Sequence, residues 1–397
     1  MVHIFFVISG FALSYKPIKA LHARDLDKCY TALASSTFRR AFRLFGPCVV
    51  STFMVLCLRQ MGYLGPAQET VVGELWKWKG ALLRQITWGW DWDRDLMPAY
   101  DIHLWTIPIE FAHSMLLFMV VMMLSRVKMH VRVAGVVGLM GYCLMCGKWA
   151  GFEFLAGLFL AEVFLLKQEG KRQKEWEGGR VEGGEEGGLV MGPGMLVKGL
   201  QMVMVLMGLF IGGWPNRNAD KTPGISWFLE KTPLPFAEMD HLAPQKFWFG
   251  LSAVATVWAV GELDFLRKFF EGGLAQYCGK ISFAVYIMHG PVMDTIQASI
   301  LGHGVIPARG QPGQANFKEA LPAVGVKGYF GVKTPAQITV SWFIGLCMIG
   351  PFVIWAADVF WRVVDNRIVD WGKRLENWCL DEDTGPSPRS QGYSVAA

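Results

Sequence analysis

The sequence predicts an all-α protein, a polytopic transmembrane bundle of about nine spanning helices. Hydrophobic residues make up 52% of the 397 positions, and they gather in blocks rather than in periodic stripes. Blocks such as Leu104 to Leu124 and Ile338 to Ala357 approach the ~20 apolar residues that cross ~30 Å of hydrocarbon. Many of the 17 Trp residues lie near block ends, as in the aromatic belts of membrane interfaces.

The expected segments follow the chain in order, and the charge of their connections orients them. The first, 1–14, has no basic region before its apolar run and no small-residue cleavage site, which indicates a spanning helix rather than a signal peptide. The connections 15–43, 125–132, 167–195 and 262–280 are the most densely basic, which places them in the cytoplasm. The nine segments are 1–14, 44–60, 104–124, 133–147, 151–166, 196–213, 247–261, 281–300 and 338–360.

The predicted membrane domain covers residues 1–378. Within it, 168–193 mixes charged residues with glycine and holds few apolar side chains, which predicts a flexible cytoplasmic linker. The polar tail, 379–397, is expected to be disordered. With nine spans the tail is cytoplasmic and Met1 lies on the opposite side of the membrane.

Composition argues against two classes of partner. The formal net charge of +5 is modest, and the basic residues lie mainly between apolar blocks, so we expect no nucleic-acid partner. Cys143 and Cys146 are the only close cysteine pair, and no second pair completes a set of metal ligands. We therefore expect no metal.

Glu110 is a charged residue inside the segment 104–124. An ionised side chain in hydrocarbon costs about 2.5–3.5 kcal/mol on insertion scales, so this carboxylate is a candidate catalytic residue. Pro108 removes a backbone donor and opens the helix near Leu104, as is typical beside a buried polar cavity. His113 follows three positions after Glu110, on the same helical face. The simpler interpretation is an interface carboxylate that reaches water.

His289, near the middle of 281–300, is the second candidate catalytic residue. The following Gly290-Pro291 predicts a loosened helix where the imidazole projects. The alternative is a histidine that hydrogen-bonds a neighbouring helix. Taken alone, Glu110 and His289 would suggest the proton relay of an ion-coupled transporter.

Two further patterns lie near the N-terminus. Arg40 and Arg43 are three positions apart, so they share a helical face and could hold phosphate oxygens, or could simply anchor the helix in the cytoplasm. Ser9 and Gly10, in the first segment, would let another helix approach closely, which alone indicates packing.

Together these sites resemble the membrane acyltransferase 3 family, particularly its fungal members. The order and spacing of the motifs extend from the first segment to residue 291, and the first motif is quite specific. The matching residues are Phe5 to Phe11, then Arg40 and Arg43, then Leu104-Trp105-Thr106 leading to Glu110, then Ile281-Ser282 through Tyr286 to His289.

The resemblance implies an integral-membrane O-acyltransferase that moves an acyl group, commonly acetyl from acetyl-CoA, to a hydroxyl of a small-molecule, sugar or lipid acceptor. It implies a cytoplasmic acyl-CoA site in which Arg40 and Arg43 contact the phosphates, with Ser9 and Gly10 among the cofactor-binding residues. Glu110 and His289 would line the polar core as catalytic residues. Such chemistry needs a general base near the hydroxyl and a donor for the developing oxyanion.

The sequence departs from the family pattern at its start. Family members have about ten spanning helices, and the first carries an Arg and a His that is expected to act as the base. Here we expect that helix to be missing, either because the start codon is assigned too late and the protein is longer or because the protein is truncated. His3, His103 and His113 could supply a base, although the resemblance assigns none of them that role. The alternatives are a catalytically inactive, truncated acyltransferase-like protein or a transporter of acyl groups.

Overall fold

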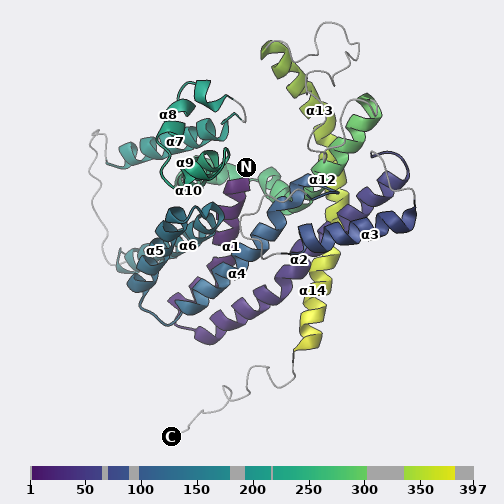
Figure 1. Cartoon of the computed structure of the whole chain (residues 1–397). Helices are drawn as coiled ribbons and strands as arrows, with labels where there is room; N and C mark the ends of the chain where they lie inside the picture. Colours follow the sequence, from purple (N-terminus) through teal and green to yellow (C-terminus); the bar gives the residue numbers. More distant parts are fainter. Residues whose placement is uncertain are drawn as a thin grey trace.

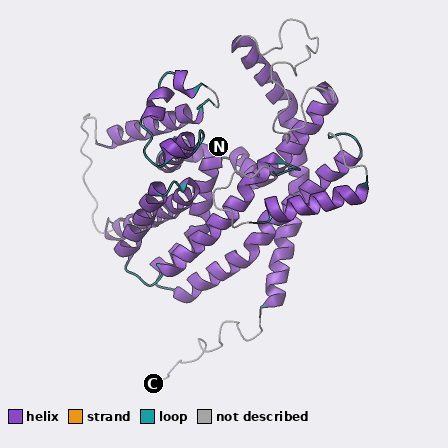
Figure 2. Cartoon of the chain, viewed as in Figure 1, coloured by secondary structure: helices purple, strands orange, loops and turns teal. Residues whose placement is uncertain are grey.

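A computed structural model describes residues 2–64, 70–88, 98–178, 193–215, 218–301 and 335–380. Every regular element in these ranges is a helix (Figure 2), as the sequence predicts. The first part contains α1 (Val2–His22), α2 (Leu26–Gln60), α3 (Val71–Ala81), the π-helical turn η1 (Leu82–Ile86), the 3-10 turn η2 (Ile102–Trp105), α4 (Thr106–Met123), α5 (Met129–Met145) and α6 (Trp149–Gly178). The second part contains α7 (Pro193–Gly212), η3 (Ala219–Lys221), α8 (Ile225–Glu230), α9 (Phe236–Met239), α10 (Ala243–Glu262), α11 (Asp264–Glu271), α12 (Gly273–Leu301), α13 (Pro335–Phe360), the π-helical turn η4 (Trp361–Asp365) and α14 (Asn366–Cys379).

Each of the nine predicted segments coincides with one of these helices. Within the described ranges, four helices are long and apolar enough to cross a membrane: α1, α2, α4 together with η2, and α6 as far as Gly170. The pair α10 and α11, bent by 90°, would make a fifth. The architecture is therefore that of a helical membrane protein, and the number of nine spans stays a prediction.

Two helices continue beyond the predicted segments. α1 runs through Pro17 to His22, and α6 continues through a polar stretch to Gly178. That stretch is rich in Lys, Gln and Glu, which are good helix formers. The linker predicted over 168–193 is therefore helical at its start; its remaining part, 179–192, and the tail from residue 381 lie outside the described residues.

Three helices, α1, α2 and α4, contact one another at the centre of the bundle (Figure 1). α6 packs along α1, and α5 packs against α6. On the same side of the bundle, α10 contacts α1 and α6, and α7 packs against α10. On the other side of α2 lie α14 and the pair α12 and α13. One buried apolar cluster, with Phe6, Leu117 and Phe154, joins α1, α4 and α6; another, with Leu44 and Ile287, joins α2 to α12.

Close approach of α1 and α6 depends on two glycines. A Cβ atom built on Gly10 would collide with the carbonyl oxygen of Phe154, and one on Gly157 would collide with the backbone of Val7 and Phe11. Glycine at both positions lets the two backbones touch. The close helix approach predicted at Gly10 is confirmed.

Gly10→Ala is expected to destabilise the protein by about 1–3 kcal/mol, because overpacking against a backbone atom forces α1 and α6 apart. The matched control is Gly138→Ala on α5, where a new Cβ would meet nothing within 4 Å and alanine is the better helix former. Denaturant unfolding of both purified variants in detergent measures the difference. Equal stability of the two variants would contradict the packing role of Gly10.

Candidate functional site

The backbone ahead of Glu110 is irregular, as predicted. η2 is a 3-10 turn, and α4 begins directly after it at Thr106. Pro108 occupies the third position of α4, where a backbone N–H has no partner within the helix, so the proline leaves the helix intact. Glu110 thus lies in the second turn of a regular helix, behind a tight entry turn.

Glu110 is the centre of a buried polar cluster that also contains Ser9, Arg40 and Ser114 (the Glu110 cluster). Its Oε1 accepts a 2.5 Å hydrogen bond from Arg40 Nη2 and a 3.2 Å bond from Ser9 Oγ. Arg40 Nε donates to Ser114 Oγ over 3.0 Å. The residues come from α1, α2 and α4, and Glu110 and Arg40 are only 2% and 7% exposed. The carboxylate therefore points into the bundle, contrary to the simpler interface interpretation.

One oxygen of this carboxylate is unsatisfied. Glu110 Oε2 is buried and has no hydrogen-bond partner among the described residues. A buried polar atom without a partner is costly, so such atoms in native proteins usually face a water or a ligand. The Glu110 cluster therefore has an open acceptor position.

The two predicted arginines have different environments. Arg40 is buried in the Glu110 cluster, whereas Arg43 is exposed one turn later on α2. Arg43 lies near Asp365, at the end of the π-helical turn η4. Burial raises the pKa of the Asp365 carboxyl above its usual range, and the charge of Arg43 opposes this rise. Sequence reasoning did not identify Asp365.

Ser9 and Gly10 also have different environments. Ser9 faces Glu110, while Gly10 is covered by the backbone of α6. His113, predicted beside Glu110, is buried, and its Nδ1 is 2.8 Å from the carbonyl oxygen of Ile109.

His289 lies in a second polar group, together with Asp101, His103 and Tyr286 (the histidine cluster). The ring centroids of His289 and His103 are 4.3 Å apart. His103 Nδ1 is 3.0 Å from Asp101 Oδ1, and the Tyr286 hydroxyl contacts both the backbone of His103 and Thr106 Oγ1. The ring of His289 thus lies against a neighbouring element, but its Nδ1 is 2.5 Å from the carbonyl oxygen of Tyr286 in its own helix, so the hydrogen bond to a neighbouring helix that the alternative interpretation expected stays a prediction.

The predicted helix break after His289 is wrong. α12 continues through Gly290 and Pro291 as far as Leu301. Proline removes only one backbone donor, and membrane helices tolerate this loss where neighbouring helices pack around the site. Gly290 has a different role, since a Cβ there would lie 2.8 Å from His103 Nδ1.

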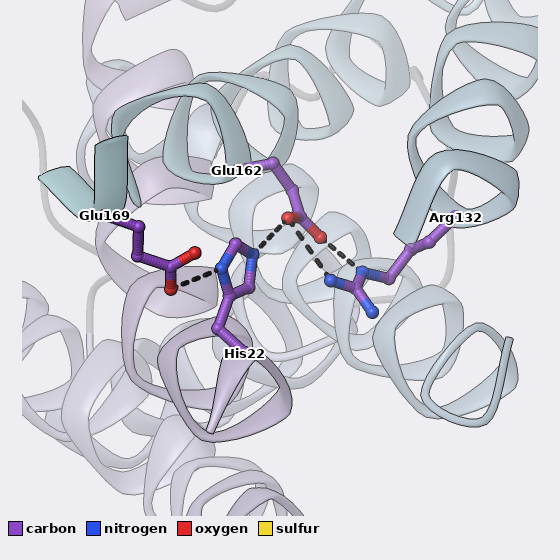
Figure 3. A network of polar contacts seen from close by, with 4 residues as sticks. All are labelled: His22, Arg132, Glu162 and Glu169. Atoms are coloured by element: carbon purple, nitrogen blue, oxygen red, sulfur yellow. Dashed lines mark hydrogen bonds and ion pairs between the residues drawn. The ribbon is translucent and has the colours of Figure 1, made fainter. Parts of the chain in front are cut away.

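A separate ionic network connects α1, α5 and α6, and sequence reasoning missed it. Figure 3 shows Glu162 between the guanidinium of Arg132 and the imidazole of His22, with Glu169 at the other ring nitrogen. His22 Nε2 is 2.7 Å from Glu162 and Nδ1 is 2.9 Å from Glu169. Carboxylates of the protein contact both ring nitrogens of His22, and Glu162 accepts hydrogen bonds from Nε and Nη2 of Arg132. We therefore interpret this network as structural.

An apolar cavity of about 220 Å³ lies between α2, α12 and α13. Its lining includes Met54, Met288, Pro291 and Trp355, with the buried hydroxyl of Ser51. Met288 and Pro291 are close neighbours of His289 in α12, so the cavity borders the element that carries this imidazole.

A family model for an acyltransferase domain, acyltransferase 3, matches residues 1–362. The chain belongs to this family. Acyltransferase 3 proteins are membrane-associated, and the matched range contains both the Glu110 cluster and the histidine cluster. No solved structure matches the chain significantly.

Three fungal proteins illustrate how far this likeness extends. The O-acetyltransferase PaAT-1 of Phomopsis amygdali is 28% identical over 341 residues, covering 77% of this chain and 63% of that protein. Acyltransferase clz18 of Cochliobolus lunatus is 24% identical and acyltransferase R4 of a Phoma species is 22% identical, each covering 72% of this chain and 66% of the relative. The chain therefore spans a little under two thirds of the length of these acyltransferases.

Proposed function

We propose that this acyltransferase 3 protein is a multi-pass membrane enzyme that transfers an acetyl group from acetyl-CoA to a hydroxyl of its acceptor. The observation that carries the proposal is the Glu110 cluster, a buried ion pair assembled from three helices with one carboxylate oxygen still open. A relative that is named an O-acetyltransferase supports the oxygen acceptor.

The two arginines take different roles in this proposal. Arg43 is exposed at the predicted cytoplasmic side, where its guanidinium can pair with the phosphates of CoA. Arg40 is engaged with Glu110 and Ser114, so it holds the carboxylate in place. Ser9 adds a third contact to the same oxygen.

In the reaction, the acceptor oxygen attacks the carbonyl carbon of the thioester, the carbon–sulfur bond breaks, and CoA leaves as the thiol. Glu110 Oε2 is placed to accept a hydrogen bond from a bound hydroxyl. His289 lies in the histidine cluster on η2 and α12, and these two elements contact α4 and α2, which carry Glu110 and Arg40.

Arg43→Ala is expected to weaken acetyl-CoA binding by about 10- to 100-fold, because a hydrogen bond between charged groups contributes about 1.5–3 kcal/mol. Equilibrium binding of radiolabelled acetyl-CoA to the purified full chain measures this change. Arg43→Lys keeps the charge but loses the planar fork, so it should show an intermediate loss.

The control is Lys128→Ala, which removes an equal charge from an exposed residue on the same predicted side. Loss of binding in both variants would indicate a general charge effect rather than a site at Arg43. Wild-type protein that neither binds acetyl-CoA nor releases thiol from it would refute the proposed acetyltransferase activity. Binding without turnover would support the non-catalytic alternative.

A further inference from the structure

The short helix α11 carries its apolar and its charged side chains on opposite faces. Four of its eight residues are charged, and the other four are Phe or Leu. The apolar residues form two adjacent pairs that are four positions apart, and residues at this spacing share one face of a helix. The apolar stripe of α11 therefore consists of Phe265, Leu266, Phe269 and Phe270.

The apolar stripe is largely uncovered. Phe265, Phe269 and Phe270 are 54%, 69% and 50% exposed, and the rings of the last two lie 5.2 Å apart, edge to face. α11 packs against α10 and α12, the helices that precede and follow it in the chain. Contiguous exposed apolar side chains beside charged ones mark an interaction surface.

Two ion pairs fix the level at which α11 begins. Lys167 of α6 lies 2.5 Å from Glu262, at the end of α10, and also lies over the ring of Trp258. Lys198, near the start of α7, is 3.9 Å from Asp264, the first residue of α11. Water-facing charges beside a tryptophan are typical of a membrane interface. Three helices therefore meet at one level, which is the cytoplasmic edge expected from the basic connections.

α11 leaves this level at a right angle to α10. The two helices are bent by 90°, and the break is at Leu263, whose backbone is extended. Because α10 contains the predicted spanning segment 247–261, a helix perpendicular to it runs along the membrane instead of across it. A span that included α11 would also carry its four charges into the hydrocarbon, where each is costly.

We propose that α11 lies in the cytoplasmic membrane interface, with its apolar stripe among the acyl chains just below the headgroups and its charged face toward water. The partner of this surface is the bilayer itself. Two acidic and two basic side chains balance one another on the charged face, so the contact is apolar and a zwitterionic bilayer is sufficient. α11 then fixes the level at which α12, the helix with His289, enters the bundle. This inference is independent of the proposed acyl transfer.

The first test uses the wild-type full chain in phosphatidylcholine nanodiscs. Two phosphatidylcholine probes carry a photoreactive diazirine, one near the headgroup end of the acyl chain and one near its methyl end. Peptide mass spectrometry then locates the crosslinks. A helix buried about 5–10 Å into the boundary should react with the shallow probe at least about fivefold more than with the deep one. The control is Val203, which is 54% exposed in the middle of α7 and should prefer the deep probe.

The second test changes one face of α11 at a time. Phe269→Glu/Phe270→Glu places two charges in the apolar stripe and should lower shallow labelling of Phe265 at least about fivefold, because the helix leaves the acyl chains. Lys268→Glu, on the charged face, should keep this labelling within about twofold. The unfolding temperature of both variants should equal that of the wild type, because the stripe packs against lipid rather than protein.

Three results would overturn the inference. Deep labelling of α11 as strong as that of Val203 would make the helix part of a span. No labelling of α11 by either probe, together with a lower unfolding temperature for Phe269→Glu/Phe270→Glu, would show that protein covers the stripe. Shallow labelling that occurs only after phosphatidylserine is added would show an electrostatic contact in place of the apolar one.

Discussion

Arg40→Met is expected to lower the free energy of unfolding by about 3–5 kcal/mol and to abolish acetyl-CoA turnover. Arg40 and Glu110 are 7% and 2% exposed, so removal of the guanidinium leaves a carboxylate buried without its counter-charge. Breaking a buried ion pair in this way is far more destabilising than the pair itself is stabilising. Denaturant unfolding in detergent, followed by circular dichroism, measures the loss.

Two further variants make this result specific. Arg39→Met removes the neighbouring guanidinium, which is 38% exposed and lies 3.0 Å from Glu376; an exposed pair contributes about 1 kcal/mol or less. The double variant Arg40→Met/Glu110→Leu replaces the pair by apolar groups and should recover most of the stability. It should not recover turnover, because the proposed reaction needs the carboxylate. An Arg40→Met protein as stable as Arg39→Met would contradict a buried pair.

Much of the helical framework follows from the sequence because hydrocarbon imposes a simple length rule. All nine apolar blocks coincide with helices, since an apolar run in a membrane must satisfy its own backbone hydrogen bonds. Helix ends were harder to predict. α6 extends into a charged stretch as far as Gly178, because helix propensity continues where hydrophobicity stops.

The polar site was only partly predictable. Glu110 could be predicted because it is a single charge in an apolar block, which the neighbouring residues in the sequence are enough to show. Its pairing with Arg40 was not, because the two residues are 70 positions apart and the pattern of α2 does not show which arginine faces inward. Asp101 and His103 lie in a connection, where charged residues are ordinary, so only the packing of α12 against η2 makes them notable.

Glu162→Leu is expected to have a similarly large effect, a loss of about 3–5 kcal/mol of unfolding free energy. Glu162 is 1% exposed and contacts both the guanidinium of Arg132, itself 5% exposed, and the imidazole of His22. An arginine does not lose its proton in a protein, so the substitution leaves a buried cation without a partner. The unfolding measurement used for Arg40→Met applies here.

Glu169→Leu is the matched control, because Glu169 lies on the same helix and contacts the same imidazole but is 43% exposed. A solvent-exposed partner contributes about 1 kcal/mol or less, so the two glutamates should differ by at least about 2 kcal/mol. The double variant Arg132→Met/Glu162→Leu should recover most of the loss, because it removes the unpaired cation. Equal losses at Glu162 and Glu169, or no recovery in the double variant, would contradict the expectation that the buried pair of Glu162 and Arg132 stabilises the packing of α1, α5 and α6.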